Sequence, residues 1–92
     1  MIQDEMFLKW MEEYFINNNK LKYALIDASD NERLLMAMWS SIYYGKVGMK
    51  VRNYMRETHP EIDNDFPKYG DFEDYSWELI NKLIEKWKRQ LE

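Results

Sequence analysis

Residues 71–89 read DFEDYSWELINKLIEKWKR, and this stretch decides the fold class. Asp71 or Asp74 is expected to cap a helix here, because an Asp side chain accepts a hydrogen bond from an amide of the first turn. The large apolar residues that follow have the spacing of one helical face. That face is expected to be buried and consists of Trp77, Ile80, Leu83, Ile84 and Trp87. Basic residues near its end suit the negative end of the helix dipole; they are Lys82, Lys86, Lys88 and Arg89.

The first third of the chain carries two further helical segments. Residues 4–16 are expected to form an amphipathic helix, because their apolar residues also recur at three- and four-residue steps. The Asn residues at 17–19 are expected to end it, since Asn tolerates the left-handed conformation common at helix C-termini. Residues 20–28 fit either a short strand or one helical face. A lone strand would lack a partner, so a short helix is favoured.

Residues 29–32 read Ser-Asp-Asn-Glu, which is the spacing of a capping box. A helix is expected to begin there, with a buried stripe made of Leu34, Leu35, Met38, Trp39 and Ile42. Gly45 can end this helix, whereas the residues after Gly48 permit it to continue through Arg56 at a cost of about 1 kcal/mol per glycine. Pro60 stops it in either case. Residues 59–70 are expected to form a loop, because Pro60, Pro67 and Gly70 punctuate them.

These patterns predict an all-α protein, a single helical domain over residues 1–92 built as a compact bundle of four to five helices. A chain of this size buries only roughly 60 to 65% of its unfolded surface, so the 4 Trp, 7 Tyr, 4 Phe and 7 Met are needed for an efficient core. The chain has no Cys and no apolar run near the length of about 20 residues that a bilayer requires. A cytoplasmic protein with no membrane contact is therefore expected.

Residues suited to catalysis or cofactor binding are few. His59 is the only histidine, and with no Cys to accompany it the expected role is that of a helix-end residue rather than a metal ligand. Residues 63–65 resemble the start of a calcium loop, but Pro67 takes the next ligand position and Lys68 stands where the sharp-turn glycine belongs. A serine nucleophile would need a positioned base. The protein is expected to be no enzyme and to hold no cofactor or metal.

Residues 43–57, YYGKVGMKVRNYMRE, contain the candidate binding features. The GKVG at 45–48, followed by Val51, resembles the GxxG turn of KH nucleic-acid-binding domains, where the backbone approaches phosphates. The resemblance implies a KH-like protein that binds nucleic acid through this turn. The acidic residues after position 60 would oppose a phosphate backbone, so nucleic acid is kept as the alternative partner.

The second half of the chain carries another similarity. Gly48-Met49, then Arg52-Asn53, an Asp-rich segment and the Asp-Tyr-Ser of residues 74–76 resemble a group of small uncharacterised bacterial and phage proteins with a GMxxRN segment. The group implies no activity. In physical terms, an Arg fork needs a carboxylate and Asn needs amide or carbonyl partners, and residues 71–74 supply both. Arg52 is either buried against Asp71, Glu73 or Asp74, or exposed as a contact for a partner.

Binding of another protein is the favoured function. Aromatic residues make up 16% of the chain, more than so small a core hides easily, and Trp, Tyr and Arg dominate binding hot spots. The candidate partner-binding residues are Tyr43, Tyr44, Arg52, Asn53, Arg56, Tyr69, Asp71 and Glu73. A composition typical of an AT-rich genome suggests an inhibitor or regulator of a host protein, encoded by a phage or mobile element. The alternatives are the KH-like protein and a structural homo-oligomer such as a homodimer.

Overall fold

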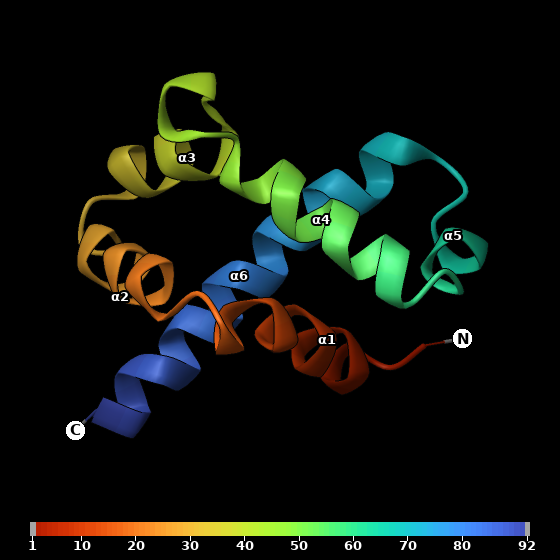
Figure 1. Ribbon diagram of the computed structural model, residues 1–92, viewed down its shortest axis with the longest axis horizontal. Coiled ribbons are helices and arrows are strands. Elements are labelled where there is room, and N and C mark those ends of the chain that lie inside the picture. Colours follow the sequence, from red (N-terminus) through yellow and green to blue (C-terminus); the bar gives the residue numbers. More distant parts are fainter. Residues whose placement is uncertain (1, 92) are drawn as a thin grey trace.

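The computed structural model describes residues 2–91, apart from the side chain of Tyr69. Within that range the chain forms helices and no strand, which confirms the predicted all-α class. Figure 1 shows their arrangement, in the order α1 (Asp4–Ile16), α2 (Asn19–Ala28), α3 (Glu32–Ser40), the 3-10 helix η1 (Ile42–Tyr44), α4 (Val47–Thr58), α5 (Ile62–Asp65) and α6 (Tyr69–Leu91). Five of the α-helices are long, as predicted, and α5 is a single turn. No helix among the described residues is long and apolar enough to cross a membrane.

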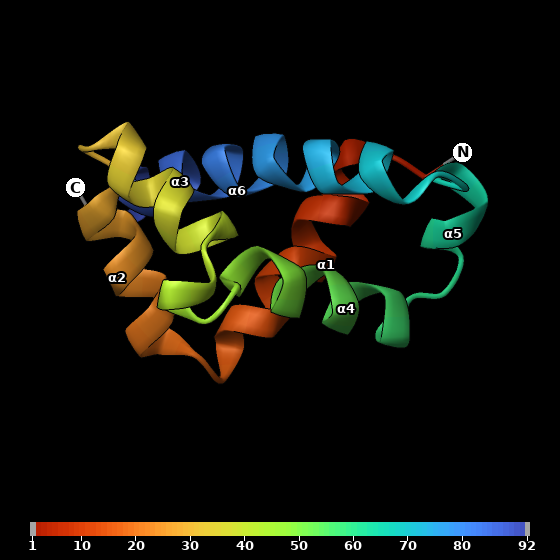
Figure 2. The same ribbon diagram turned by 90° about the horizontal axis from the view of Figure 1, so that it is seen from above.

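The long helix α6 runs along one side of the molecule, and α1, α2 and α4 pack against it (Figure 2). Most of its predicted face is fully buried, and Trp77 is half-buried. Phe72 and Leu79 are also fully buried and extend this face. The predicted capping is wrong, because α6 begins at Tyr69 and therefore contains both Asp71 and Asp74.

The segment between α4 and α6 is anchored rather than a loose loop. Its single turn α5 places Ile62 in the core with no exposed surface. Phe66 then enters an aromatic cluster, with its ring 5.7 Å from that of Phe7 and 5.0 Å from that of Tyr75. The prediction of a loop over residues 59–70 is therefore wrong in part. The segment contains the helical turn α5, and its Ile62 and Phe66 side chains pack in or against the core.

Two details of the predicted helix ends are wrong. Asn17 ends α1 without a left-handed backbone, since its φ is −104°. The capping box at residues 29–32 does not form, because Ser29 still belongs to the end of α2 and its hydroxyl donates to the Ile26 carbonyl. Asn31 is the actual cap, and its side chain accepts from the Leu34 amide at 3.2 Å.

The stripe predicted on α3 is only partly buried. Leu35 and Trp39 lie in the core, whereas Leu34 and Ile42 are exposed. The helix ends at Ser40 and the next residue is extended, so Ile42 leaves the helical register. Gly45 and Lys46 then both adopt left-handed backbone, with φ of 83° and 53°. These residues separate η1 from α4, and no continuous helix runs through them.

Gly48 lets α4 approach α3 closely. A Cβ built on this glycine would lie 2.7 Å from the indole Nε1 of Trp39 and 2.8 Å from its carbonyl oxygen. Gly48, the second glycine of the GxxG sequence, is therefore needed for the packing of α4 against α3. The sheet that accompanies this turn in KH domains has no counterpart in residues 2–91.

We expect Gly48→Ala to lower the free energy of unfolding by about 1 to 3 kcal/mol, because the new methyl group overpacks the contact with Trp39. Gly70→Ala is the matched control: no atom lies within 4 Å of its Cβ position. Chemical denaturation measures both variants. Equal stability of the two variants would show that α3 and α4 separate without cost.

The α1–α6 contact contains a partly buried polar link. The Glu12 carboxylate accepts hydrogen bonds from the Trp87 indole at 3.0 Å and from the Lys86 ammonium at 3.1 Å. Burial raises the pKa of Glu12, but these two hydrogen bonds and the charges of Lys86 and Lys22 outweigh it and leave the pKa below its ordinary value of 4.5. The ionised carboxylate therefore stabilises the folded protein.

We expect Glu12→Gln to flatten the loss of stability in acid. A carboxyl group whose pKa is lowered by folding stabilises above its ordinary pKa, and this contribution disappears as the pH falls through the folded-state value. The difference in unfolding free energy between wild type and variant should thus be present at pH 7 and shrink below about pH 4.5. Lys86→Gln, which keeps the carboxylate, should reduce the same pH dependence in part. A wild-type slope in Glu12→Gln would contradict this account.

Candidate binding surface and the Arg52 cleft

The eight predicted binding residues do not form one site. Tyr43 and Tyr44 are neighbours on η1, and Arg52 meets Glu73 between α4 and α6. Asn53 is exposed, and no described hydrogen bond joins it to residues 71–74, so the network predicted for it does not form. Asp71 is likewise exposed. The side chain of Tyr69 lies outside the described part of the structure.

Arg56 makes its contacts between α4, α5 and α6. Its guanidinium lies 3.5 Å from the Asp63 carboxylate of α5 and 4.8 Å from the centroid of the Phe72 ring. These contacts hold α5 against α4 and α6. The structure therefore gives Arg56 contacts within the protein, one helical turn beyond Arg52.

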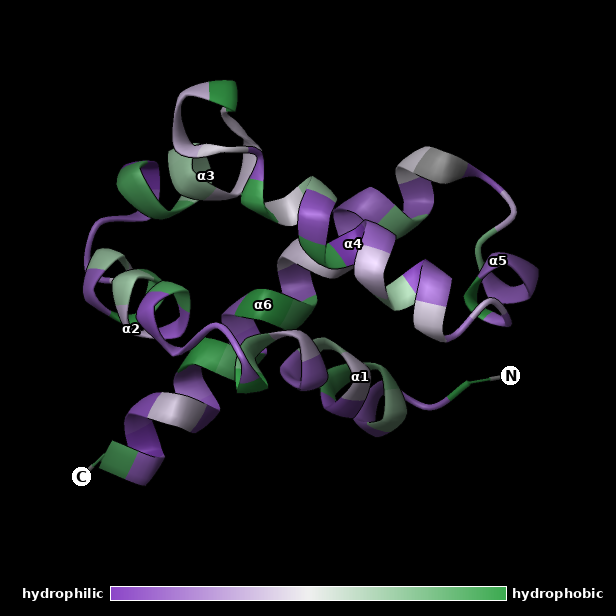
Figure 3. Ribbon diagram, in the orientation of Figure 1, coloured by the Kyte–Doolittle hydropathy of each residue, from purple (hydrophilic) through white to green (hydrophobic). Residues whose placement is uncertain are grey.

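The 3-10 helix η1 presents large side chains to solvent. Ile42 is 68%, Tyr43 92% and Tyr44 50% exposed. We call these three residues the η1 surface. The turn that carries them projects at the edge of the molecule, and part of it is coloured as hydrophobic (Figures 1 and 3).

Ser41 fixes the backbone of this turn. Its hydroxyl accepts from the Tyr43 amide at 3.2 Å. Its carbonyl accepts from the amides of Tyr44 at 3.2 Å and Lys46 at 3.1 Å. Because three hydrogen bonds converge on one residue, the tyrosines extend from an ordered turn rather than from a loose loop. Sequence reasoning missed both Ser41 and the exposure of Ile42.

Arg52 is buried, which decides between its two predicted states. Only 6% of its surface is exposed. Its Nη1 donates to the Ser76 hydroxyl at 3.1 Å, and its Nη2 lies 3.8 Å from the Glu73 carboxylate. Ser76 is fully buried and in turn donates to the Glu73 carbonyl at 2.8 Å. Glu73 is the predicted acidic partner, whereas the Ser76 contact was not foreseen, because a lone serine in a helix has no distinctive sequence signal.

A cleft between α3, α4 and α6 exposes one edge of this arrangement. It has two adjoining hollows of about 340 and 170 Å³. Both are lined by Trp39, Ser40, Arg52 and Glu73. We call this region the Arg52 cleft. It brings together a buried cation, a buried indole and an exposed carboxylate, and it begins next to the η1 surface, because Ser40 and Lys46 flank η1 in the chain.

We expect Ser76→Ala to destabilise the fold more than Glu73→Gln. The first change removes a buried acceptor from a charged donor and should cost roughly 1 to 3 kcal/mol. The second weakens an ion pair whose carboxylate side chain is 54% exposed, and it should cost less than about 1 kcal/mol. Denaturant unfolding of both variants measures the difference. The reverse order would mean that the ion pair, not the hydrogen bond, holds Arg52.

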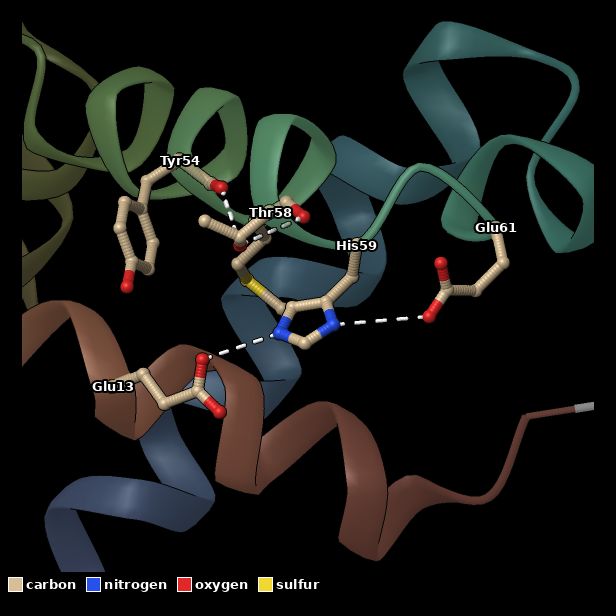
Figure 4. Close-up of polar contacts among 6 residues, drawn as sticks. Glu13, Tyr54, Thr58, His59 and Glu61 are labelled. Carbon is tan, nitrogen blue, oxygen red and sulfur yellow. Dashed lines mark hydrogen bonds and ion pairs between the residues drawn. The ribbon is translucent and has the colours of Figure 1, made fainter.

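His59 follows α4 as its C-cap, in agreement with the predicted helix-end position. Figure 4 shows its ring between two carboxylates, with Nε2 3.1 Å from Glu13 of α1 and Nδ1 3.7 Å from Glu61. The ring also stacks on Trp10, with centroids 4.0 Å apart. These contacts join α1 to the start of the segment that contains α5. Among the described residues no group of three His, Cys, Asp or Glu side chains is placed to hold a metal ion.

A third hollow, of about 490 Å³, lies between α1, α2 and α6. Its polar side chains are largely engaged within the protein. Glu12 binds Lys86 and the indole of Trp87, Glu13 binds His59, and the Lys22 ammonium lies 5.2 Å from the Trp87 ring centroid. It therefore offers fewer uncommitted groups than the Arg52 cleft.

Comparison with known proteins identifies no relative: no protein-family model, curated protein or solved structure matches this chain.

Proposed function

We propose that this protein is a small, non-enzymatic module that binds another protein through the η1 surface. The observation that carries the proposal is the exposure of three consecutive large residues, Ile42 to Tyr44, on a hydrogen-bonded turn. Among the described residues, every other aromatic side chain except Tyr23 is buried or half-buried, so this placement leaves unusual apolar surface uncovered. A partner would cover it.

The ordered turn favours binding in two ways. Tyrosine combines a large contact area with only two rotatable side-chain bonds, so it loses little entropy when it is held in an interface. The backbone hydrogen bonds of Ser41 already fix the turn, so binding need not order it. Tyr43, at 92% exposed, is the residue we expect to enter a pocket of the partner.

We propose in addition that the partner is a host protein and that a phage or mobile element encodes this module as an inhibitor or regulator. The support is compositional: Asn, Lys, Ile and Tyr are frequent, which is typical of AT-rich genomes. The residue pattern also lacks the elements of a reaction centre. A module with no chemistry of its own can act on a host protein only by occupying its surface.

We expect Tyr43→Ala to weaken partner binding by at least about thirtyfold, which corresponds to about 2 kcal/mol for a hot-spot residue. Its unfolding free energy should stay within about 0.5 kcal/mol of wild type, because the side chain is exposed. Affinity capture with quantitative mass spectrometry, comparing wild type with the variant, identifies a protein whose recovery depends on this surface. Tyr23→Ala is the matched control, since Tyr23 is 46% exposed on α2.

Two results would contradict the proposal. If wild type and Tyr43→Ala recover the same proteins in the same amounts, the η1 surface is not the binding surface. If the mass of the pure protein instead doubles with concentration and Tyr43→Ala abolishes the doubling, the surface joins two copies of this chain, which is the homo-oligomer alternative.

A further inference from the structure

The larger hollow of the Arg52 cleft, of about 340 Å³, has an apolar wall that the fold leaves partly uncovered. Met36 of α3 is 47% exposed, and Trp77 of α6 is only half-buried although the spacing of its helix predicted burial. Both side chains line this hollow. Its volume lies near the lower end of the roughly 300 to 1,000 Å³ that ligand sites occupy. The hollow therefore suits one long side chain of another molecule better than a large ligand.

Three carboxylates stand around this wall, and helix geometry explains their placement. Residues three and four apart lie on the same side of a helix, so Glu73 and Asp74 lie one turn before Trp77. Glu78 lies one turn beyond Asp74. All three acidic residues line the hollow and are exposed. The lining contains one positive charge, that of Arg52, which already lies 3.8 Å from Glu73, so the hollow is negatively charged as a whole.

The two remaining carboxylates have no cation of their own. No ion pair or hydrogen bond among the described residues reaches the carboxylate of Asp74 or Glu78. Lys82, one turn beyond Glu78, pairs with Asp4 of α1 at 3.7 Å. Like charges four residues apart on a helix destabilise it. The free protein thus retains a repulsion between Asp74 and Glu78 that a cation from another molecule would relieve.

An arginine side chain fits both parts of this hollow. Its methylene stem packs on apolar surface while the charged head group remains beside polar groups. Its planar guanidinium stacks on Trp rings and binds carboxylates through paired hydrogen bonds. An apolar side chain would instead cover the carboxylates without a hydrogen-bond partner, which costs free energy. An anion would be repelled.

We propose that this hollow binds an arginine side chain of the protein partner. The stem lies against Met36 and Trp77, and the guanidinium lies between Asp74 and Glu78. The source of the arginine rests on the proposed function, because it belongs to the protein that covers the η1 surface. Ser40 lines the hollow and stands directly before the turn that carries this surface, so one partner reaches both places. The partner therefore has a basic residue beside the apolar surface that covers η1.

Titration of the isotope-labelled full chain with Nα-acetyl-arginine amide tests the site without any partner. The compound replaces sodium chloride at constant ionic strength and pH 7, and indole N–H signals are followed by NMR. We expect a saturable shift of the Trp77 signal, whereas the signals of Trp10 and Trp87, which do not line the hollow, should not shift. Nα-acetyl-citrulline amide has nearly the same shape but no charge. It should bind at least about fivefold more weakly, because it forms no ion pair.

Variants of the hollow separate its two parts. Asp74→Asn and Glu78→Gln should each bind the arginine derivative about two- to fivefold more weakly, as expected for exposed ion pairs. Glu85→Gln is the matched control, because it removes the same charge from an exposed position of α6 outside the hollow and should leave the affinity unchanged. Met36→Ala should weaken binding of the arginine and citrulline derivatives alike, because it removes a contact with the stem.

The proposal is overturned if the Trp77 signal shows no saturable shift, or if the citrulline derivative binds as tightly as the arginine derivative. Equal weakening by Glu85→Gln and Glu78→Gln would also overturn it, since the effect would then belong to the overall charge. Nα-acetyl-lysine amide provides a further arm, and binding as tight as that of the arginine derivative would contradict the assignment to arginine.

Partner capture tests the source of the arginine. The double variant Asp74→Asn, Glu78→Gln should lower the recovery of the same protein that Tyr43→Ala loses, and unchanged recovery would contradict this source. If the pure protein doubles its mass with concentration and the double variant abolishes the doubling, the arginine belongs to a second copy of this chain and the assignment to another protein is overturned. The titration needs no partner, so the hollow can bind the arginine derivative even if Tyr43→Ala leaves capture unchanged. Failure of this site and failure of the η1 proposal are therefore distinguishable.

Discussion

Coverage of the apolar face of α6 is the constraint on which the rest of the structure depends. Each large side chain fully buried on this face contributes about 1.5 to 3 kcal/mol, whereas a surface ion pair such as Lys88 with Asp30 contributes about 0 to 1 kcal/mol. The apolar contacts therefore determine where α1, α2 and α4 lie against α6. The polar contacts, including the hydrogen bond from Trp87 to Glu12, then make smaller adjustments to how these helices lie on α6.

The long helices could be predicted because their apolar periodicity reports this burial directly. The bounds of α1 were predicted as the structure has them, whereas the starts of α3 and α6 were not, because several polar residues compete as caps there. Ser29 and Asn31 are both residue types that cap helices well. Asn31 caps α3, because α2 extends to Ala28 and the Ser29 hydroxyl donates to the Ile26 carbonyl instead. The segment after α4 was read as a loop for a similar reason. Its composition is polar, and only its tertiary contacts reveal that Ile62 and Phe66 anchor it.

The candidate site was predictable in its residue types but not in its geometry. The sequence limited the partners of Arg52 to a few carboxylates, and the structure selects Glu73 while adding the buried Ser76. Asn53 follows Arg52 in the chain but lies on the exposed side of α4, since successive helical residues point about 100° apart. Adjacent residues in a motif therefore need not share a role. Exposure of Ile42 depended on a single extended residue after α3, which periodicity cannot detect.

One packing contact sets the frame from which the η1 surface extends. Trp39 rests on Gly48, and this close approach sets the distance between the end of α3 and the start of α4. The short connection between them must then reverse within a few residues, which it does through η1 and the left-handed residues Gly45 and Lys46. Tyr43 lies in this connection and is 92% exposed. Gly48 thus keeps α3 and α4 close together, and Gly45 and Lys46 supply the left-handed backbone that lets the chain pass from one helix to the other through the exposed η1 turn.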